Sequence, residues 1–325
     1  MTDAIRIHQF GGPEVLGLES VTVADPGPGE VRLHHSHIGL NYIDVYFRTG
    51  VYQPAAMPFT PGFEAAGEVI AVGEGVSDVG VGDRVAYAAR PPGAYAEERV
   101  ISADSLVKLP AVIGNEQAAG MMLKGMTAHM LLKRVYAVQP GDAVLVHAAA
   151  GGVGLILCQW ARHLGATVIG TVGSEAKAEL ARAHGCHHPV LYRDEDIGER
   201  VRQITGGEGV AVAYDSVGAD TLRQSLGCLR RRGMLVSFGQ SSGKPPAIEV
   251  GELAAGGSLF MTRPTIFDYV GEREPMRAAA EALFDVVAKG VVSIEIGRRF
   301  GLAQAAEAHR ALEARQTTGS TVLTV

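Results

Sequence analysis

A glycine-rich segment carries the clearest chemical signal in the sequence. An apolar run over residues 143–147 leads into three alanines and then three glycines within residues 151–154. A Cβ at those glycines would keep a pyrophosphate away from the backbone, whose free N–H groups at a helix start bind phosphate. Ala149 replaces the first glycine of the usual G-x-G-x-x-G spacing, and tight packing is the alternative role. With a strand before it and a helix after it, the segment predicts a dinucleotide site that includes Gly151, Gly152 and Val153.

The end of the next predicted strand, residues 167–172, indicates which dinucleotide binds. An acidic side chain there would accept a hydrogen bond from an unmodified ribose 2′-hydroxyl and would repel a 2′-phosphate. Gly173 and Ser174 follow the strand, and Lys177 comes one turn later, so the sequence favours NADPH over NADH. Glu175 argues in the other direction. The alternative roles are a helix N-cap for Ser174 and a solvated helix face for Lys177.

The elements that position this loop alternate between strands and helices. Strands are expected at 143–147, 167–172, 210–214 and 234–238, with helices at 153–164, 175–184 and 221–229 between them. Such alternation predicts parallel βαβ units with right-handed crossovers, which form a Rossmann-type domain. Two local expectations accompany this one: a helix over 115–135 that Gly125 interrupts, and a loop at His187-His188.

Both flanks of this region have a different pattern. Residues 1 to about 120 contain short strand candidates between Gly/Pro turns, such as 31–37 and 65–72, which predicts a β-rich barrel-like or sandwich-like unit. After residue 262, helices at 277–289 and 302–315 precede a terminal strand at 321–324. We therefore expect an α/β fold in which a nucleotide-binding domain is inserted between two parts of another domain.

Composition argues against several other classes of protein. The net charge is −6 and no basic stripe is present, so nucleic acid is not an expected partner. The three cysteines form no CxxC pair, which argues against a disulfide framework or a structural zinc and favours a reducing cytoplasm. No signal peptide is predicted, and no apolar stretch reaches the ~20 residues that a membrane helix needs.

Motifs beyond the glycine loop carry a family resemblance over nearly the whole chain. In sequence order they are Asn41-Tyr42-Ile43-Asp44, Pro61-Gly62-Phe63-Glu64-Ala65-Ala66-Gly67, Leu123-Lys124-Gly125-Met126-Thr127, Tyr214-Asp215-Ser216-Val217-Gly218 and Ser237-Phe238-Gly239. The chain resembles the zeta-crystallin and quinone oxidoreductase branch of the zinc-free medium-chain dehydrogenase/reductase superfamily. Within that branch it is most similar to the bacterial NADPH:quinone oxidoreductases.

The resemblance implies an enzyme that passes reducing equivalents from NADPH to a small-molecule quinone. It implies a GroES-like catalytic domain from residues 1–122 and 263–325, and a Rossmann domain from residues 123–262, with the cofactor in the cleft between them. Bacterial members are often homodimers, and here the strand near Ser258 to Thr262 would form the interface.

The residues that hold zinc in related alcohol dehydrogenases are missing, so no metal site is expected. The Gly-His-Glu triplet is here Gly62-Phe63-Glu64, and phenylalanine cannot ligate zinc. Residues 38–44 and 88–98 contain no cysteine, and among the nearby histidines only His35 and His37 could converge on one strand face. An alcohol needs a Lewis acid before hydride leaves its carbon, whereas an electron-poor quinone needs mainly to be held near the nicotinamide.

The resemblance also assigns roles to residues of the catalytic domain. Asn41 and Tyr46 would face the nicotinamide, and Tyr52 would border the acceptor. Tyr46 and Tyr52 are the proton-donor candidates. The alternatives are a buried turn for Asn41 and plain packing for Tyr52.

Further residues would contact the cofactor along its length. Lys124, Thr127 and His129 would approach its ribose and phosphates, and Tyr192 would pack beside Gly173, Ser174 and Lys177. The residues that follow two of the predicted strands would lie at the carboxyl edge of the sheet, and they are Ser216, Val217, Phe238, Gly239, Gln240 and Ser241. Arg263 and Arg315 would bridge the returning chain to the cofactor. A packing or surface role is the alternative for His129 and for both arginines.

Two other functions stay open. An NADPH-dependent enone or alkenal double-bond reductase would share the fold, the cofactor and the missing zinc, because loops build the acceptor pocket. A crystallin-like or RNA-binding protein is the alternative from another class. The negative charge argues against RNA, and the intact glycine loop argues against a purely structural role.

Overall fold

The computed structural model describes all 325 residues, and the chain divides into two compact units. The first unit consists of residues 1–126, 270–288 and 294–325, and the second of residues 127–269 and 289–293. Division is expected, because single cores stop growing at about 250–300 residues. The domain limits after residues 122 and 262 stay predictions.

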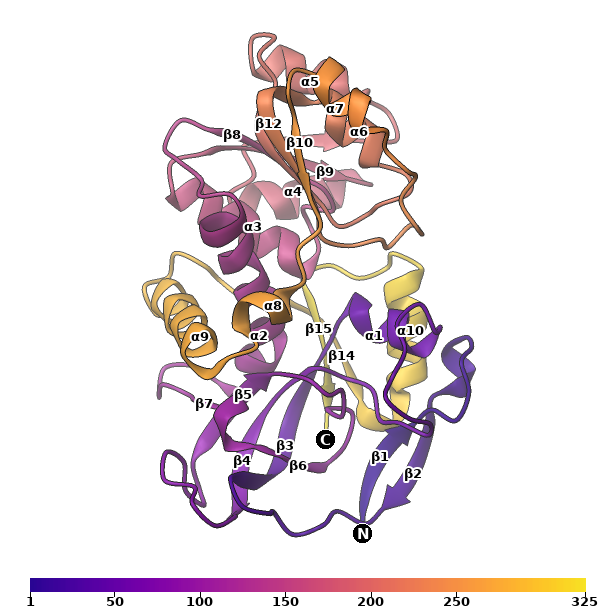
Figure 1. Cartoon of the computed structure of the whole chain (residues 1–325), viewed down its shortest axis with the longest axis vertical. Coiled ribbons are helices and arrows are strands. Elements are labelled where there is room, and N and C mark those ends of the chain that lie inside the picture. The colour runs from indigo at the N-terminus through magenta and orange to yellow at the C-terminus, as the bar shows by residue number, and fades with distance from the viewer. The chain divides into compact units, whose positions relative to one another are not determined.

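The second unit is built on a parallel sheet (Figure 1), which has six strands. Its strands are β8 (Ala143–Val146), β9 (Thr167–Val172), β10 (His188–Leu191), β11 (Val210–Asp215), β12 (Leu229–Ser237) and β13 (Phe260–Thr262). They lie in the order β10-β9-β8-β11-β12-β13, and every neighbouring pair is parallel. Numbered along the chain, this is the 3-2-1-4-5-6 order of the Rossmann fold. The predicted fold class of this region is confirmed.

Helices connect these strands and cover the sheet. They are α3 (Gly152–His163), α4 (Glu175–Ala183), α5 (Ile197–Ile204), α6 (Leu222–Gly227) and α7 (Val250–Ala255). The apolar side chains of Ile197, Val201 and Leu222 are buried with Leu145 and Ile169 of the sheet in one core. Each strand therefore ends at the same edge of the sheet, next to the turn that begins the following helix.

Two elements of the second unit differ from the sequence prediction. The predicted loop at His187-His188 is wrong for His188, which begins β10 and pairs with β9. Pro189 weakens the strand signal in this short segment, but it is tolerated because β10 is an edge strand. Helix α5 was not expected from the sequence, although Ile197 and Val201 have helical spacing.

The first unit contains a seven-stranded sheet and a separate hairpin. The strands are β3 (Glu30–Leu40), β4 (Glu64–Val72), β5 (Arg84–Ala88), β6 (Glu98–Ser102), β7 (Val107–Lys108), β14 (Ile296–Gly301) and β15 (Ser320–Thr324), and the hairpin pairs β1 (Thr2–Arg6) with β2 (Gly17–Val21). The sheet order is β14-β15-β3-β4-β5-β7, and β6 also pairs with β3. The antiparallel pair of β3 and β15 joins parts of the first unit from either side of the second unit in one sheet, as expected for a GroES-like domain interrupted by an insertion.

One helix departs from its predicted form. The remaining helices of the chain are α1 (Tyr42–Arg48), α2 (Asn115–His129), α8 (Ile266–Val270), α9 (Arg273–Ala288) and α10 (Ala305–Glu313). The expected interruption of α2 at Gly125 is wrong, since α2 is continuous and a π-helical stretch, Met130–Val135, follows it. A Cβ at Gly125 would collide with the side chain of Leu283. Glycine therefore serves close packing of α2 against α9 rather than a break.

Two general properties bear on the sequence expectations. None of the helices combines the length and apolar character that crossing a bilayer requires. All three cysteines are free and buried.

Candidate cofactor and acceptor site

The glycine loop joins β8 to α3, with Gly151 at the N-cap position of the helix. The first N–H groups of a helix have no partner within it, so those of Gly152 and Val153 are available to an anion. A Cβ at Gly154 would collide with the Ala148 carbonyl. Gly154 thus serves tight packing, which was the alternative role of the glycine segment. The start of α3 keeps the geometry of a phosphate site.

A buried histidine fixes the start of this loop. His147 follows β8 directly, and its ring nitrogens lie 3.0 Å from Thr171 Oγ1 and 2.9 Å from Ser225 Oγ. Ser225 in turn donates to Asp215 Oδ2 at 2.9 Å. Ser225 Oγ then accepts from Nε2–H, and Nδ1 accepts from Thr171, because burial lowers the pKa of His147 and keeps the ring neutral. The chain of hydrogen bonds joins the ends of β8, β9 and β11.

Asp215 also holds the turn after β11. Its Oδ1 accepts the backbone N–H groups of Val217 at 2.8 Å and Gly218 at 3.0 Å, and the Thr221 hydroxyl at 2.8 Å. Asp215 and His147 were not among the site residues expected from the sequence. Their signal is a polar residue at the end of a buried parallel strand, where ligands of such sheets bind.

The residues expected after β11 and β12 come together. The Ser241 and Ser242 N–H groups donate to the Ser216 and Val217 carbonyls at 3.2 and 2.8 Å. A Cβ at Gly239 would lie 2.6 Å from the Ser216 carbonyl oxygen, so this approach needs glycine. Phe238 and Gln240 lie in the same segment directly after β12.

Arg263 follows the edge strand β13 and reaches the same place. Its guanidinium donates to the Ser237 and Gly239 carbonyls, both at 3.3 Å, and to Gln240 Oε1 at 3.0 Å. These bonds fix the segment after β12, so Arg263 is not an ordinary surface arginine.

The end of β9 has the features expected around a 2′-phosphate. Ser174 is the N-cap of α4, and its Oγ accepts the Lys177 N–H at 3.4 Å. Its hydroxyl hydrogen remains able to donate to a phosphate oxygen, so the N-cap role and the binding role are compatible. Glu175, the residue that argued against NADPH, forms an ion pair with Arg182 at 2.8 Å. A Cβ at Gly173 would lie 2.7 Å from the hydroxyl of Tyr192, whose side chain is 37% exposed.

In the first unit, Glu64 joins two of the expected site residues. Its Oε1 accepts the side-chain amide of Asn41 at 2.7 Å and lies 2.6 Å from Lys124 Nζ, and its Oε2 accepts the Leu123 N–H at 2.6 Å. Glu64 and Lys124 are both buried. The charge of Lys124 is therefore already balanced within the protein. Sequence reasoning missed Glu64, which was read only as part of the triplet that lacks a zinc ligand.

Aromatic rings gather around α1. The Tyr46 ring centroid lies 5.6 Å from that of Tyr42 and 5.4 Å from that of Tyr52, and Phe47 lies 5.8 Å from Tyr52 and 5.1 Å from Phe63. The two proton-donor candidates are thus adjacent. Such rings present flat faces and edges that suit a planar acceptor.

Three further expected residues lie as follows. Thr127 and His129 belong to the second unit, and the His129 ring packs 5.8 Å from that of Trp160, with a pKa lowered by burial. This contact gives the His129 ring a packing partner. Arg315 lies in the first unit just after α10 with a left-handed backbone (φ 57°). Burial raises the pKa of Tyr42, and the positive charge of Arg315 partly opposes this rise.

The position of the zinc ligand is filled by a buried ring. Phe63 is fully buried. His35 uses both ring nitrogens, with Nδ1 2.7 Å from the Ala96 carbonyl and Nε2 3.0 Å from the Tyr87 hydroxyl. The expectation that His35 and His37 could share a strand face is wrong, because a β-bulge interrupts β3 between them.

A Rossmann-type unit within a GroES-like chain, with Phe63 at the zinc-ligand position, defines a medium-chain dehydrogenase/reductase without the catalytic zinc set. Family models agree in both regions: residues 27–111 match the alcohol dehydrogenase GroES-like domain, and residues 152–285 match the zinc-binding dehydrogenase family. The chain is 49% identical to a quinone oxidoreductase of Pseudomonas aeruginosa over 99% of both chains.

Two other comparisons are informative. A 2-haloacrylate reductase of a Burkholderia species is also 49% identical over 99% of both chains. The crystal structure of Escherichia coli quinone oxidoreductase complexed with NADPH has a TM-score of 0.97 and 46% identity, and it covers 99% of this chain and 100% of that one. The chain belongs to the quinone oxidoreductase family, and the resemblance seen in its motifs is confirmed.

Proposed function

We propose that the chain is an NADPH:quinone oxidoreductase that works without zinc. The observation that carries the proposal is the end of β9, where Gly173 and Ser174 take the place of an acid and Glu175 pairs with Arg182. This arrangement accommodates a 2′-phosphate, which an acid at the strand end would repel. The relatives named quinone oxidoreductase, one of them solved with NADPH, support the same assignment.

We propose two groups of binding residues. The second unit would hold NADPH through the start of α3 and the strand ends, with Gly151, Gly152, Val153, Gly173, Ser174, Lys177, Tyr192, Ser216, Val217, Phe238, Gly239, Gln240, Ser241 and Arg263, together with Thr127 and His129. The first unit would supply Asn41, Tyr46, Tyr52, Lys124 and Arg315. Bound NADPH supplies the reducing equivalents, and the protein's part is to orient the acceptor and keep water away from it.

Protonation of the reduced acceptor is proposed for Tyr46 or Tyr52. Their ring centroids lie 5.4 Å apart. Tyr46 lies on α1, and the backbone N–H of Tyr52 donates to the Tyr46 carbonyl at 3.0 Å. A phenol hydroxyl can donate a hydrogen bond to a quinone oxygen and is neutral at neutral pH.

The assembly proposed is a homodimer through β13. This strand pairs only with β12 and forms the edge of the sheet, and Phe260 and Met261 on it are 56% and 37% exposed. An unpaired strand edge with apolar side chains is a template for pairing with another chain. Neither nucleic acid nor a membrane is proposed as a partner, and the cytoplasm stays the predicted location.

Reduction of an electron-poor carbon–carbon double bond is the second candidate, because one relative is named 2-haloacrylate reductase. An acrylate carries a carboxylate and needs a cation to receive it. Two buried cations of the first unit, Lys124 and Arg48, already pair with Glu64 and Glu313. This pairing favours an uncharged quinone.

The test is the rate of NADPH and NADH oxidation with 1,4-benzoquinone, a larger polycyclic quinone and a simple alkenal. We expect fast turnover of NADPH with the quinones and slow turnover with the alkenal. Turnover with the alkenal alone would show that the protein is a double-bond reductase and not a quinone reductase. Equal use of NADH would overturn the argument from the end of β9.

A further inference from the structure

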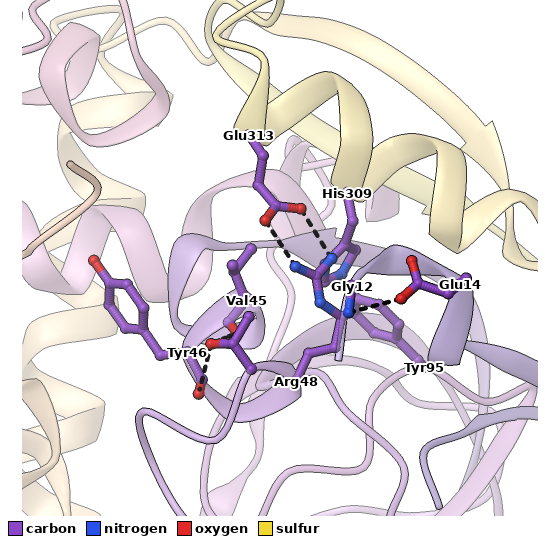
Figure 2. Close-up of polar contacts among 9 residues, drawn as sticks. Gly12, Glu14, Val45, Tyr46, Arg48, Tyr95, His309 and Glu313 are labelled. Atoms are coloured by element: carbon purple, nitrogen blue, oxygen red, sulfur yellow. Dashed lines mark hydrogen bonds and ion pairs between the residues drawn. The ribbon is translucent and has the colours of Figure 1, made fainter. Parts of the chain in front are cut away.

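A chain of buried polar side chains links α1 to α10 in the first unit. Figure 2 shows Arg48 beside Glu313 and His309, with Tyr95 on the other side of the histidine ring. Arg48 donates to Glu313 at 2.9 and 2.7 Å and lies 3.3 Å from His309 Nδ1. The Tyr95 hydroxyl lies 3.1 Å from His309 Nε2 and 3.1 Å from Asp44 Oδ2. Of these residues only Glu313 is appreciably exposed.

The chemistry of the groups sets the direction of each hydrogen bond. A guanidinium can only donate, so His309 Nδ1 accepts from Arg48. The ring is neutral, because burial and the charge of Arg48 lower the pKa of His309 to about 3. Its one proton is therefore on Nε2 and is donated to the Tyr95 oxygen, which leaves the Tyr95 proton for Asp44. The bonds run in one direction, from Arg48 through His309 and Tyr95 to Asp44.

The chain ends at the first turn of α1. Asp44 Oδ2 also accepts the backbone N–H of Asn41 at 2.8 Å, so the carboxyl fixes the residue that precedes the helix. The side chain of that residue, Asn41, bonds to Glu64. A change in the position of Asp44 would therefore move Asn41 relative to Glu64.

The helix itself needs such an anchor. It has only seven residues, and helices of that length are unstable without tertiary contacts. Asp44 and Arg48 are four residues apart and form one stripe, while Tyr42 and Tyr46 form another on the opposite side. The polar chain holds the first stripe, and the second stripe carries the aromatic rings.

We propose that Arg48, His309, Tyr95 and Asp44 are positioning residues that set the amino end of α1, and with it Asn41 and Tyr46, for the acceptor. All four side chains are buried. The kinetic part of this inference rests on the proposed quinone reduction, and the geometric part does not.

Tyr95→Phe tests the kinetic part, because it removes the bridging hydroxyl and keeps the ring. We expect the KM for 1,4-benzoquinone to rise about tenfold with a smaller change in kcat. Binding of 2′,5′-ADP, which reports only the adenosine phosphate site of the second unit, should stay within about twofold. Tyr87→Phe is the matched control, since Tyr87 is equally buried in the same unit and bonds to His35 instead. Equal kinetic effects of the two variants would overturn the proposal.

The tautomer of His309 tests the geometric part without any variant or substrate. Long-range ¹H–¹⁵N correlation spectra of the wild-type protein should show His309 neutral with the proton on Nε2 at neutral pH. A proton on Nδ1, or a charged ring, would overturn the directed chain. If the protein reduced no quinone but His309 showed the expected tautomer, the proposed function would fail and the network would stand.

Discussion

Two buried histidines show how single residues fix geometry in this protein. His147 lies between Thr171 and Ser225 in the second unit, and His309 lies between Arg48 and Tyr95 in the first. Both rings are neutral because burial lowers their pKa. Each accepts at Nδ1 and donates at Nε2, and both chains of hydrogen bonds lead to a buried carboxyl. Unpaired polar groups in such sites are destabilising, so the loss of one member should destabilise the rest of its network.

Ser174→Asp separates the two roles of Ser174. Aspartate is as good an N-cap as serine, so the stability of α4 should be kept. Its charge should repel the 2′-phosphate, so we expect the KM for NADPH to rise roughly tenfold or more while that for NADH changes little. Steady-state kinetics with both cofactors and a thermal melt check this. Unchanged preference for NADPH with an unchanged melt would exclude Ser174 from the phosphate site.

Asp44 gives a prediction for the pH dependence of stability. Burial raises its pKa from 3.8 to about 7, so between these values the native state holds a proton that the unfolded chain has released. The contribution of Asp44 to the free energy of unfolding is therefore present at low pH and is lost as the pH rises through about 7. The free energy of unfolding of Asp44→Asn minus that of wild type should therefore be larger at pH 8 than at pH 5.

Urea denaturation at the two pH values measures this difference. Buried His35 and His309, with pKa lowered to about 3, act in the opposite direction, since their contribution is lost as the pH falls below about 6.5. Both histidines are present in wild type and variant, so their contributions to the difference in free energy of unfolding cancel to first order. Asp25→Asn, at a fully exposed side chain, is the control. A difference between Asp44→Asn and wild type that does not change with pH would contradict the raised pKa.

At the scale of elements, helix–helix contact explains why α2 tolerates a glycine in its interior. Alanine is favoured over glycine in a helix by up to about 1 kcal/mol. At position 125, however, the added Cβ would collide with Leu283 of α9. The packing against α9 therefore decides whether a Gly125→Ala substitution stabilises or destabilises the protein.

Gly125→Ala should lower the free energy of unfolding by about 1–3 kcal/mol, the usual range for overpacking. In a Leu283→Ala background the collision is gone, and the same change should become neutral or stabilising by up to about 1 kcal/mol. A double-mutant cycle from denaturation curves measures the coupling. Additive effects of the two substitutions would show that the helices do not approach each other at this point.

The sequence was informative about elements wherever the pattern was local. The strand at 167–172 and the helix from residue 153 follow from apolar runs and from the glycines between them. β10 was missed because four residues with a histidine and a proline give a weak signal. Asp44, Glu64 and His147 were missed as positioning residues, because their partners are up to 78 residues away, and the partner of Tyr95 is 214 residues away.

At the scale of the whole molecule, the chain consists of an interrupted β-rich unit and a Rossmann unit whose sheet ends on one side in the exposed strand β13. β15 pairs with β3, so segments from before and after the Rossmann unit form one sheet. The edge at β13 carries Phe260 and Met261, which a partner strand would cover. The proposed dimer would use the outer side of β13, whereas the proposed cofactor site would use the carboxyl ends of the strands.

Phe260→Asp should turn a dimer into a monomer, because a charge on an edge strand opposes pairing. Sedimentation velocity measures the change. Val250→Asp, at an 81% exposed position on α7 of the same unit, is the control and should leave the dimer intact. A wild-type protein that sediments as a monomer would rule out the proposed interface.

The most direct test of the central claim is a competition for limiting NADPH between 1,4-benzoquinone and 2-chloroacrylate, present together at equal concentration. The ratio of the two products gives the ratio of the kcat/KM values, and a reaction without enzyme corrects for direct reduction. We predict hydroquinone as the product in excess by at least about tenfold. An excess of the reduced acrylate would contradict the assignment as a quinone oxidoreductase.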